Sequence, residues 1–314
     1  MHLIIGSRGS KLALWQAHWV RDQLAKTGYE LEIRIIKTSG DKLQSGLAGG
    51  PVPASMAQTV AAAGGKGLFI KEIEEALLAR EIDVAVHSMK DLPTELPAGL
   101  IIGAVPQRED ARDVFISRNG NSLEHLPPGS RVATSSLRRQ SQLRALRGDL
   151  VYVAIRGNLD TRLRKLEGGE CEALVLAAAG VRRLGFEGLI TSHFNFDQMC
   201  PAVGQGALAL EIRADDPRAG EAVARLDHSP THEAIRAERA VLRRLGGGCQ
   251  VPIAAHATEE DGSLRLRGLV ADLSGAQVIR ARAEGASADA EGLGGALAED
   301  LLRQGADEIL SRLK

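Results

Sequence analysis

The sequence predicts an α/β protein with mixed sheets that ends in a smaller α+β domain. Short apolar runs alternate with helical patterns over the first two thirds of the chain, and closely spaced strand-like runs follow after about residue 225. At 314 residues the chain is long enough for two or three domains, each with its own core. Strand and helix in alternation indicate parallel or mixed sheets with right-handed crossovers, whereas short turns between strands indicate an antiparallel sheet.

The first strand and helix follow from the N-terminal residues. Leu3–Gly6 is an apolar run typical of a buried strand. A helix is expected from about Ser10, which is a good N-cap residue. Leu12, Trp15 and Trp19 recur at i, i+3 and i+7, so we expect them to form its buried face.

A long irregular segment interrupts the next strand and helix. Leu31–Thr38 alternates apolar and polar residues and predicts a strand. Residues 42–66 are dominated by Gly, Ala, Pro and Ser, and so long a stretch within a compact domain indicates a lid. A helix is expected to resume near Gly67, followed by a strand over Asp83–Val86.

The middle of the chain repeats this scheme. Strands are expected over Arg131–Thr134, Val151–Ile155 and Ala173–Ala179. The first leads into a helix after Ser135-Ser136. The second leads into a helix striped by Leu159, Leu163 and Leu166.

The last ninety residues indicate a different architecture. A helix is expected from Thr231 to about Leu245, and a closing helix from about Asp289. Between them lie three strand-like runs near 253–258, 264–270 and 277–284. We therefore expect a small antiparallel sheet with helices packed on it.

Composition excludes several classes of protein. Lys and Arg total 39 against 40 Asp and Glu, so no overall field favours nucleic acid or an anionic membrane, and an anion site must be local. The N-terminus lacks a basic start and a long apolar stretch, and no later segment is long and apolar enough to span a bilayer. Three separated cysteines fit a reducing compartment, so we expect a cytoplasmic protein.

One cysteine lies in an unusual setting, Gly246-Gly247-Gly248-Cys249-Gln250-Val251-Pro252. Glycines remove side-chain bulk around this thiol, and an accessible thiol suits covalent attachment. The alternative is a turn that holds a small, half-buried cysteine. Cys171 lies between two glutamates that should raise its pKa, and Cys200 precedes a proline, so both are interpreted as structural.

Cations and hydroxyls gather where strands are expected to end, and ligands bind at such ends in α/β sheets. Arginines, hydroxyls and helix N-termini together suit carboxylates or phosphates. Arg139 shares a helical face with Leu143 and Leu146, so we expect it to reach past the helix end into a cleft. The strand-end residues are Arg8, Ser10, Ser88, Lys90, Asp91, Thr134, Ser135, Ser136, Arg138, Arg139, Arg156 and Arg162.

Each of these residues also has an ordinary explanation. Surface arginines are mostly solvated, Thr-Ser-Ser is a good helix cap, and Asp91 before Leu92-Pro93 could order a turn. Gly64-Gly65-Lys66-Gly67 lacks the spacing and the following Ser or Thr of an ATP-binding phosphate loop. The histidines show no pairing that would indicate a metal site.

Seven blocks, in order, resemble the porphobilinogen deaminase family, also called hydroxymethylbilane synthase. They cover nearly the whole chain, and their joint occurrence makes coincidence negligible. They are GSRGSKLALWQAH, GGKGLFIKE, AVHSMKDLPTELP, ATSSLRRQSQL, RGNLDTRLRKL, PAVGQGALALE and GGGCQVP.

The resemblance implies a fold and a reaction. It implies two periplasmic-binding-protein-like α/β domains that form the active-site cleft, 1–105 with 201–224 and 106–200, and a third α+β domain, 225–314, that carries the cofactor cysteine. It implies a monomeric transferase that condenses four porphobilinogen molecules head to tail into hydroxymethylbilane, with loss of ammonia, in porphyrin and haem biosynthesis. A dipyrromethane cofactor is expected on Cys249 through a thioether.

The resemblance also assigns residues, and no metal is expected. Asp91 matches the catalytic aspartate, and a carboxylate there can stabilise a pyrrole cation and manage protons. Lys90, Ser88, Thr134, Ser135, Ser136, Arg138 and Arg139 are expected to hold the cofactor. Substrate binding is expected from Arg8, Ser10, Arg156, Arg162, Gln205, Phe69 and Lys66. The chain departs from the family at Ala61-Ala62-Ala63, before GGKG, and in a longer Gly/Pro-rich segment.

A rival function fits the same α/β halves. A cytoplasmic protein that binds small carboxylates without catalysis would also place arginines in a cleft. Cys249 and the lack of an export signal argue against it, and the mass of the intact protein discriminates.

Overall fold

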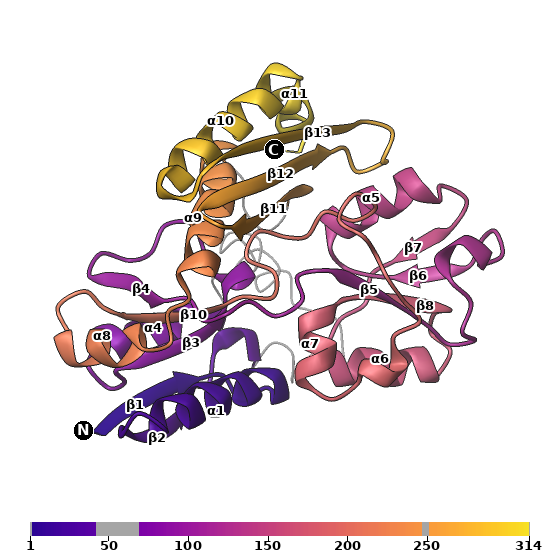
Figure 1. Ribbon diagram of the computed structural model, residues 1–314. Helices are drawn as coiled ribbons and strands as arrows, with labels where there is room; N and C mark the ends of the chain where they lie inside the picture. The colour runs from indigo at the N-terminus through magenta and orange to yellow at the C-terminus, as the bar shows by residue number, and fades with distance from the viewer. Residues whose placement is uncertain (1, 42–68, 247–250, 314) are drawn as a thin grey trace. The chain divides into compact units, whose positions relative to one another are not determined.

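The computed structural model describes residues 2–41, 69–246 and 251–313 (Figure 1). These residues form three sheets, which group into two compact units. The first unit comprises Met1–Arg108 and Ala207–His232, and the second comprises Glu109–Gly206 and Glu233–Lys314.

The first unit contains a mixed five-stranded sheet in the order β2-β1-β3-β10-β4. Strand β1 is parallel to β2 and β3, while β10 runs antiparallel to β3 and β4. A strand from late in the chain therefore lies between two early ones, and the sheet ties distant segments together. The strands are β1 (His2–Ser7), β2 (Glu30–Ile35), β3 (Val84–Ser88), β4 (Leu100–Ala104) and β10 (Leu208–Arg213).

Helices cover both faces of this sheet. Helices α1 (Lys11–Ala25) and α8 (Pro217–Ala224) bury apolar side chains in one cluster. Helix α4 (Lys71–Leu78) packs in another cluster with Ala85 and Leu100. The side chain of Ser10 accepts a hydrogen bond from the Ala13 N–H, so the expected cap of α1 is confirmed.

Two details of this unit differ from the sequence analysis. The buried side of α1 is formed by Gln16, Ala17, Val20 and Leu24, while Trp15 is 37% exposed. This set also has helical spacing, and Trp19 is partly buried and packs against the same cluster, so the expectation holds for Trp19 and is wrong for Trp15. The second strand ends at Ile35, before Thr38, because its partner β1 ends at Ser7.

The second unit contains another mixed five-stranded sheet, in the order β7-β6-β8-β5-β9. Strand β6 is parallel to β7 and β8, while β5 is antiparallel to β8 and β9. The expectation of mixed sheets is therefore confirmed in both units. The elements are β5 (Asp113–Ser117), β6 (Arg131–Ala133), α5 (Leu137–Leu146), β7 (Val151–Val153), α6 (Leu159–Glu167), β8 (Ala173–Ala177), α7 (Ala178–Arg183) and β9 (Ser192–His193).

The predicted stripe on α6 is confirmed, since Leu163 and Leu166 are buried and Leu159 packs beside them. The strand expected over Ala173–Ala179 ends at Ala177, and Ala178 begins α7. An all-apolar run suits a buried helix as well as a buried strand, so periodicity does not locate this boundary.

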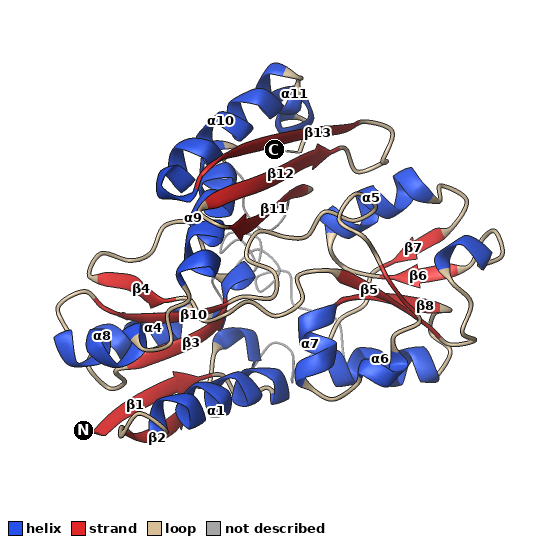
Figure 2. Ribbon diagram, viewed as in Figure 1, coloured by secondary structure: helices blue, strands red, loops and turns tan. Residues whose placement is uncertain are grey.

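The C-terminal part of the second unit is α+β, as expected. Three antiparallel strands form its sheet: β11 (Ile253–Glu260), β12 (Ser263–Ala271) and β13 (Val278–Ala286). Helix α10 packs along one face of this sheet (Figure 2). Side chains of all three strands share one core cluster with those of α9 (Ser229–Arg244), α10 (Ala290–Arg303) and α11 (Ala306–Ser311).

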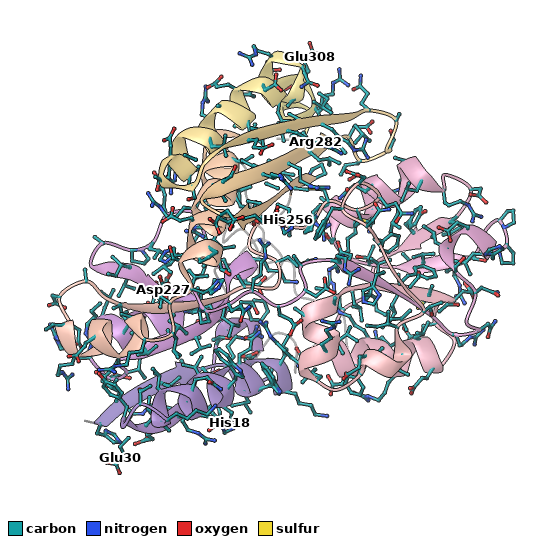
Figure 3. The ribbon with its side chains drawn as sticks, viewed as in Figure 1. His18, Glu30, Asp227, His256, Arg282 and Glu308 are labelled. Atoms are coloured by element: carbon teal, nitrogen blue, oxygen red, sulfur yellow. The ribbon has the colours of Figure 1, made fainter. Side chains whose placement is uncertain are left out.

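Aromatic and ionic contacts join this sheet to the segment before Cys200. The rings of Phe196 and His256 lie 4.2 Å apart between centroids. Asp197 forms ion pairs of 3.1 Å with Arg267 and 2.6 Å with Arg282; His256 and Arg282 are labelled in Figure 3. These contacts explain why residues 109–206 group with the C-terminal residues.

None of the described helices is both long and apolar enough to cross a membrane.

Candidate functional site

In the first unit, Arg8 lies just after β1 and is held on two sides. Its guanidinium forms an ion pair with Asp41 at 2.6 Å and lies 4.0 Å from the centroid of the Phe69 ring. Burial alone would raise the pKa of Asp41, but hydrogen bonds from Arg8 and Thr38 and the charge of Arg8 outweigh it, so that pKa lies below its usual value. The structure thus brings together two residues expected to bind substrate, Arg8 and Phe69.

The end of β3 carries the expected catalytic aspartate. Ser88 closes the strand, and Met89, Lys90 and Asp91 form a single 3-10 turn. The Met89 side chain is buried, and its N–H donates to the carbonyl of Ala207 at 3.0 Å. The turn is therefore anchored by its first residue, while Lys90 and Asp91 are only half-buried.

Ser88 and Ser10 both make hydrogen bonds within the first unit. The hydroxyl of Ser88 accepts from the side-chain amide of Gln16 at 2.9 Å, which joins the end of β3 to α1. Ser10 acts as the cap of α1. A hydroxyl has further capacity, so these bonds leave room for a ligand.

In the second unit, Arg138 and Arg139 are buried around one carboxylate. Asp113, fully buried at the start of β5, accepts from Arg138 Nη1 at 2.8 Å and from Arg139 Nε at 2.9 Å. Burial would raise the pKa of Asp113, but the two guanidinium charges lower it to about 2. Two cations and one anion leave this buried cluster with one excess positive charge.

Gln205 completes the cluster. Its amide donates to Asp113 Oδ1 at 3.0 Å and to the carbonyl of Ala111 at 2.8 Å, and its oxygen accepts from Arg139 Nη2 at 3.4 Å. The structure therefore brings three predicted site residues, Arg138, Arg139 and Gln205, into direct contact around Asp113.

The expectation for Arg139 is wrong in one respect. It shares the buried face of α5 with Leu143, as predicted, but Leu146 is exposed and Arg139 turns inward to Asp113. An internal carboxylate, 26 positions earlier in the chain, takes the place of the expected open cleft. Only the fold brings that carboxylate to α5.

The three hydroxyls before α5 all have internal partners. Ser136 caps the helix by accepting from the Arg139 N–H at 3.4 Å. The Ser135 hydroxyl donates to the carbonyl of Ile155 at 2.6 Å and accepts from its N–H at 3.0 Å. Thr134 accepts from the Ser136 N–H at 3.3 Å. These bonds fix the turn from which Arg138 and Arg139 extend.

The remaining predicted residues differ in setting. Arg156 is exposed after β7, whereas Arg162 is half-buried and donates from Nε to the carbonyl of Gly157 at 2.8 Å. Lys66, Cys249 and the segment expected to be a lid, 42–66, lie outside the described residues. Among the described residues, no group of His, Cys, Asp and Glu is arranged to hold a metal ion.

Asp113, which is buried, and Arg183, which is half-buried, are charged residues that the sequence did not indicate. Asp113 follows Arg112 at the start of a strand, and only its burial distinguishes it from a surface ion pair. Arg183, in α7, donates to the carbonyl of Gly206 at 2.8 Å, and burial lowers its pKa to about 10. An apolar run before Arg182-Arg183 is the signal that could have indicated a partly buried arginine.

Cys171 and Cys200 fit the structural role expected of them. Both are buried. Burial, with Glu172 as the next cause, raises the pKa of Cys171, and burial raises that of Cys200 to about 12. Neither thiol is suited to act as a nucleophile near neutral pH.

Comparison with known proteins identifies the relationship. Residues 3–221 match the family model "Porphobilinogen deaminase, dipyromethane cofactor binding domain", and residues 232–303 match "Porphobilinogen deaminase, C-terminal domain". The porphobilinogen deaminase of Geobacter sulfurreducens is 50% identical over 313 residues, 99% of this chain and 94% of that protein. That of Carboxydothermus hydrogenoformans is 48% identical over 314 residues, 99% and 97% of the two chains.

Among solved structures, a probable amino-acid ABC transporter extracellular-binding protein from Bacillus subtilis is similar with a TM-score of 0.42 and 11% identity, over 72% of this chain and 90% of that one. Similarity at this low level gives no information about what this chain binds. The near-complete coverage by both family models and the identity to curated relatives establish that this chain belongs to the porphobilinogen deaminase family.

Proposed function

We propose that this chain is a hydroxymethylbilane synthase, a transferase of tetrapyrrole biosynthesis that deaminates porphobilinogen and joins four molecules of it head to tail. The main structural support for this function is a buried cluster in which two arginines, Arg138 and Arg139, surround one aspartate, Asp113, and leave one excess positive charge. Porphobilinogen bears two carboxylates, an acetate and a propionate, and guanidinium groups bind carboxylates with paired donors.

The residues present fit the dipyrromethane cofactor of this family. Arg138 Nε is buried without a hydrogen-bond partner among the described residues, which calls for an acceptor such as a carboxylate of the cofactor. When bound, the dipyrromethane supplies the primer to which substrate units are added. Cys249 would hold it through a thioether. The residues that would hold its acidic arms are Ser88, Lys90, Thr134, Ser135, Ser136, Arg138 and Arg139.

Asp91 is proposed as the catalytic residue. Loss of ammonia leaves positive charge on the pyrrole of the substrate, with an acidic ring N–H. A carboxylate at the end of β3 would stabilise that charge and exchange the proton. The buried Met89 supports this role, because it fixes the turn that carries Asp91.

Substrate binding is proposed for a second set of residues. Arg8, stacked on Phe69, has a planar guanidinium ready to exchange Asp41 for a substrate carboxylate. Arg156 and Arg162 would contact the linear pyrrole product as it lengthens. The full set is Arg8, Ser10, Lys66, Phe69, Arg156, Arg162 and Gln205.

The mass of the intact protein tests this proposal. After incubation with porphobilinogen, the protein should exceed its sequence mass by one dipyrromethane, and Cys249→Ser should abolish the increment. A wild-type protein with no added mass would contradict the proposal. The same measurement separates the enzyme from the rival, a carboxylate-binding protein without catalysis, which the family membership does not favour.

The domain organisation and setting are also proposed. Three domains, 1–105 with 201–224, 106–200 and 225–314, each contain one of the three sheets, and this supports the division. We propose that the protein acts as a monomer in the cytoplasm, where two buried, unpaired thiols at Cys171 and Cys200 would persist.

A further inference from the structure

Arg138 and Arg139 are adjacent in sequence, but their guanidinium groups are used differently. Arg139 donates from Nε to Asp113, from Nη1 to the carbonyl of Val175 at 3.1 Å, and from Nη2 to Gln205. Its Nη2 also lies 2.8 Å from Asp113. All three nitrogens of Arg139 therefore have partners inside the protein.

Toward the part of the chain that the structure describes, Arg138 donates from one nitrogen, Nη1. Its Nη1 donates both to Asp113 at 2.8 Å and to the carbonyl of Cys200 at 2.7 Å. Neither Nε nor Nη2 donates to another described residue, and Nε is buried. Nε and Nη2 form one edge of the planar guanidinium, which matches the two oxygens of a carboxylate.

We propose that Asp113 is a positioning residue, which fixes Arg139 as an internal support and turns Arg138 so that its Nε–Nη2 edge binds a carboxylate of the dipyrromethane. This inference rests on the proposed function. It narrows the assignment above, in which both arginines hold the acidic arms of the cofactor: Arg138 would contact the carboxylate, and Arg139 would support Arg138 and Asp113 from inside the protein.

The charge balance supports this division. A lone buried cation would be unfavourable, and Asp113 neutralises one of the two. The second positive charge needs a further anion, and Arg138 offers the donor for it, since its buried Nε has no partner among the described residues. The Asp113 pKa near 2 keeps the carboxylate charged throughout the pH range in which the protein would be assayed.

The experiment compares Arg138→Lys with Arg139→Lys in the full chain, prepared free of dipyrromethane. Both variants keep the positive charge, so the comparison isolates donor geometry. Loading is followed by intact mass during incubation with porphobilinogen, and folding by the thermal midpoint before loading.

Arg138→Lys should load about tenfold more slowly, because one ammonium cannot replace a paired edge. Its melting temperature should fall less than that of Arg139→Lys, because a single ammonium can still donate to Asp113 and to the Cys200 carbonyl, the two partners of Nη1. Arg139→Lys should lower the melting temperature by about 5 °C or more, because Val175 and Gln205 lose donors. The reverse pattern, with slow loading from Arg139→Lys and instability from Arg138→Lys, would overturn the inference.

Asp113→Asn tests whether Asp113 acts through Arg138. As a single substitution, Asp113→Asn should slow the loading of dipyrromethane. Added to Arg138→Lys it should slow loading no further, whereas a purely structural effect would add in both backgrounds. If Asp113→Asn does not fold, Asp113→Glu, which keeps the charge and displaces it, replaces it in the same double-variant test.

The controls separate this inference from the proposed function. A wild-type chain that gains no mass would overturn the proposed function and this inference with it. A wild-type chain that loads, with Arg138→Lys loading equally fast, would overturn this inference alone.

Discussion

Glu74 is a half-buried carboxyl on α4 with a raised pKa. Burial disfavours its charge and Glu211 adds a second negative charge, while His87 acts in the opposite direction, and the result is a pKa of about 7 in place of 4.5. Between these two values the unfolded chain has lost this proton and the folded protein still holds it. The stability contributed by Glu74 is therefore complete below about pH 4.5 and is lost as the pH rises through about 7.

Glu74→Gln should raise the melting temperature more at pH 8 than at pH 5, because the neutral amide resembles the protonated carboxyl. Differential scanning calorimetry at pH 5 and pH 8 measures the melting temperatures. Glu75→Gln is the matched control on the same helix, since Glu75 is exposed and paired with Lys71 at 3.7 Å. If Glu74→Gln changed the melting temperature equally at pH 5 and pH 8, the raised pKa of Glu74 would be contradicted.

Asp91→Asn should lower turnover by about 10²-fold, the scale expected when a charged partner of the transition state is lost. The amide has the same size, so the 3-10 turn and the melting temperature should be preserved. Product formation from porphobilinogen under saturating conditions measures turnover. Glu95→Gln, an exposed carboxylate four residues later, should leave turnover unchanged. Near-normal turnover of Asp91→Asn would remove Asp91 from the mechanism.

At the scale of elements, the sequence predicts what depends on neighbouring residues. The caps at Ser10 and Ser136 and the stripe on α6 were predictable, because each involves residues within a few positions of one another. Strand β10 was not predicted. It pairs antiparallel with β3, with Glu211 opposite Ala85, and such distant pairing leaves no local signal.

The same distinction applies to the site. Strand-end position indicated Arg138, Arg139 and Asp91, since each lies within six residues of the end of an apolar run. The role of Asp113 could not be predicted, because a charged residue beside a strand is usually solvated, and only the packing of β5 against α5 buries it. Sequence thus indicates which residues gather near the site, and tertiary contacts decide how each is used.

Two adjacent glycines in α10 offer a matched pair. A Cβ on Gly294 would lie 2.7 Å from Ala240 Cβ and would overlap the carbonyl oxygen of Ala237, both in α9, whereas a Cβ on Gly295 would meet nothing within 4 Å. Gly294 therefore permits the close approach of the two helices. Gly295 serves no such purpose.

Gly294→Ala should lower the free energy of unfolding by about 1–3 kcal/mol through overpacking. Gly295→Ala should raise it by about 0.5–1 kcal/mol, the helix preference of alanine over glycine. Urea unfolding of the two variants measures both values. If Gly294→Ala were as stable as Gly295→Ala, the α9–α10 contact would be looser than described.

At the scale of the whole molecule, the charges nearly cancel, at 39 basic and 40 acidic residues. The protein as a whole therefore does not attract an anionic substrate, and binding must come from local cations. Each added porphobilinogen brings two more carboxylates, so the need for such cations grows as the product lengthens. Arg156 is exposed after β7 and makes no ion pair with another described residue, which leaves it available for this role.

Arg156→Leu should therefore impair the later additions more than the first. Intact mass after a short incubation with porphobilinogen should show enzyme carrying one or two extra units accumulating, with less fully extended chain than in wild type. Arg164→Leu is the matched control, because Arg164 is an exposed arginine on α6 whose Nη2 donates to the nearby hydroxyl of Thr161 at 3.2 Å. If the two variants gave the same distribution of masses, a general loss of surface charge would explain the effect, and Arg156 would have no specific part in elongation.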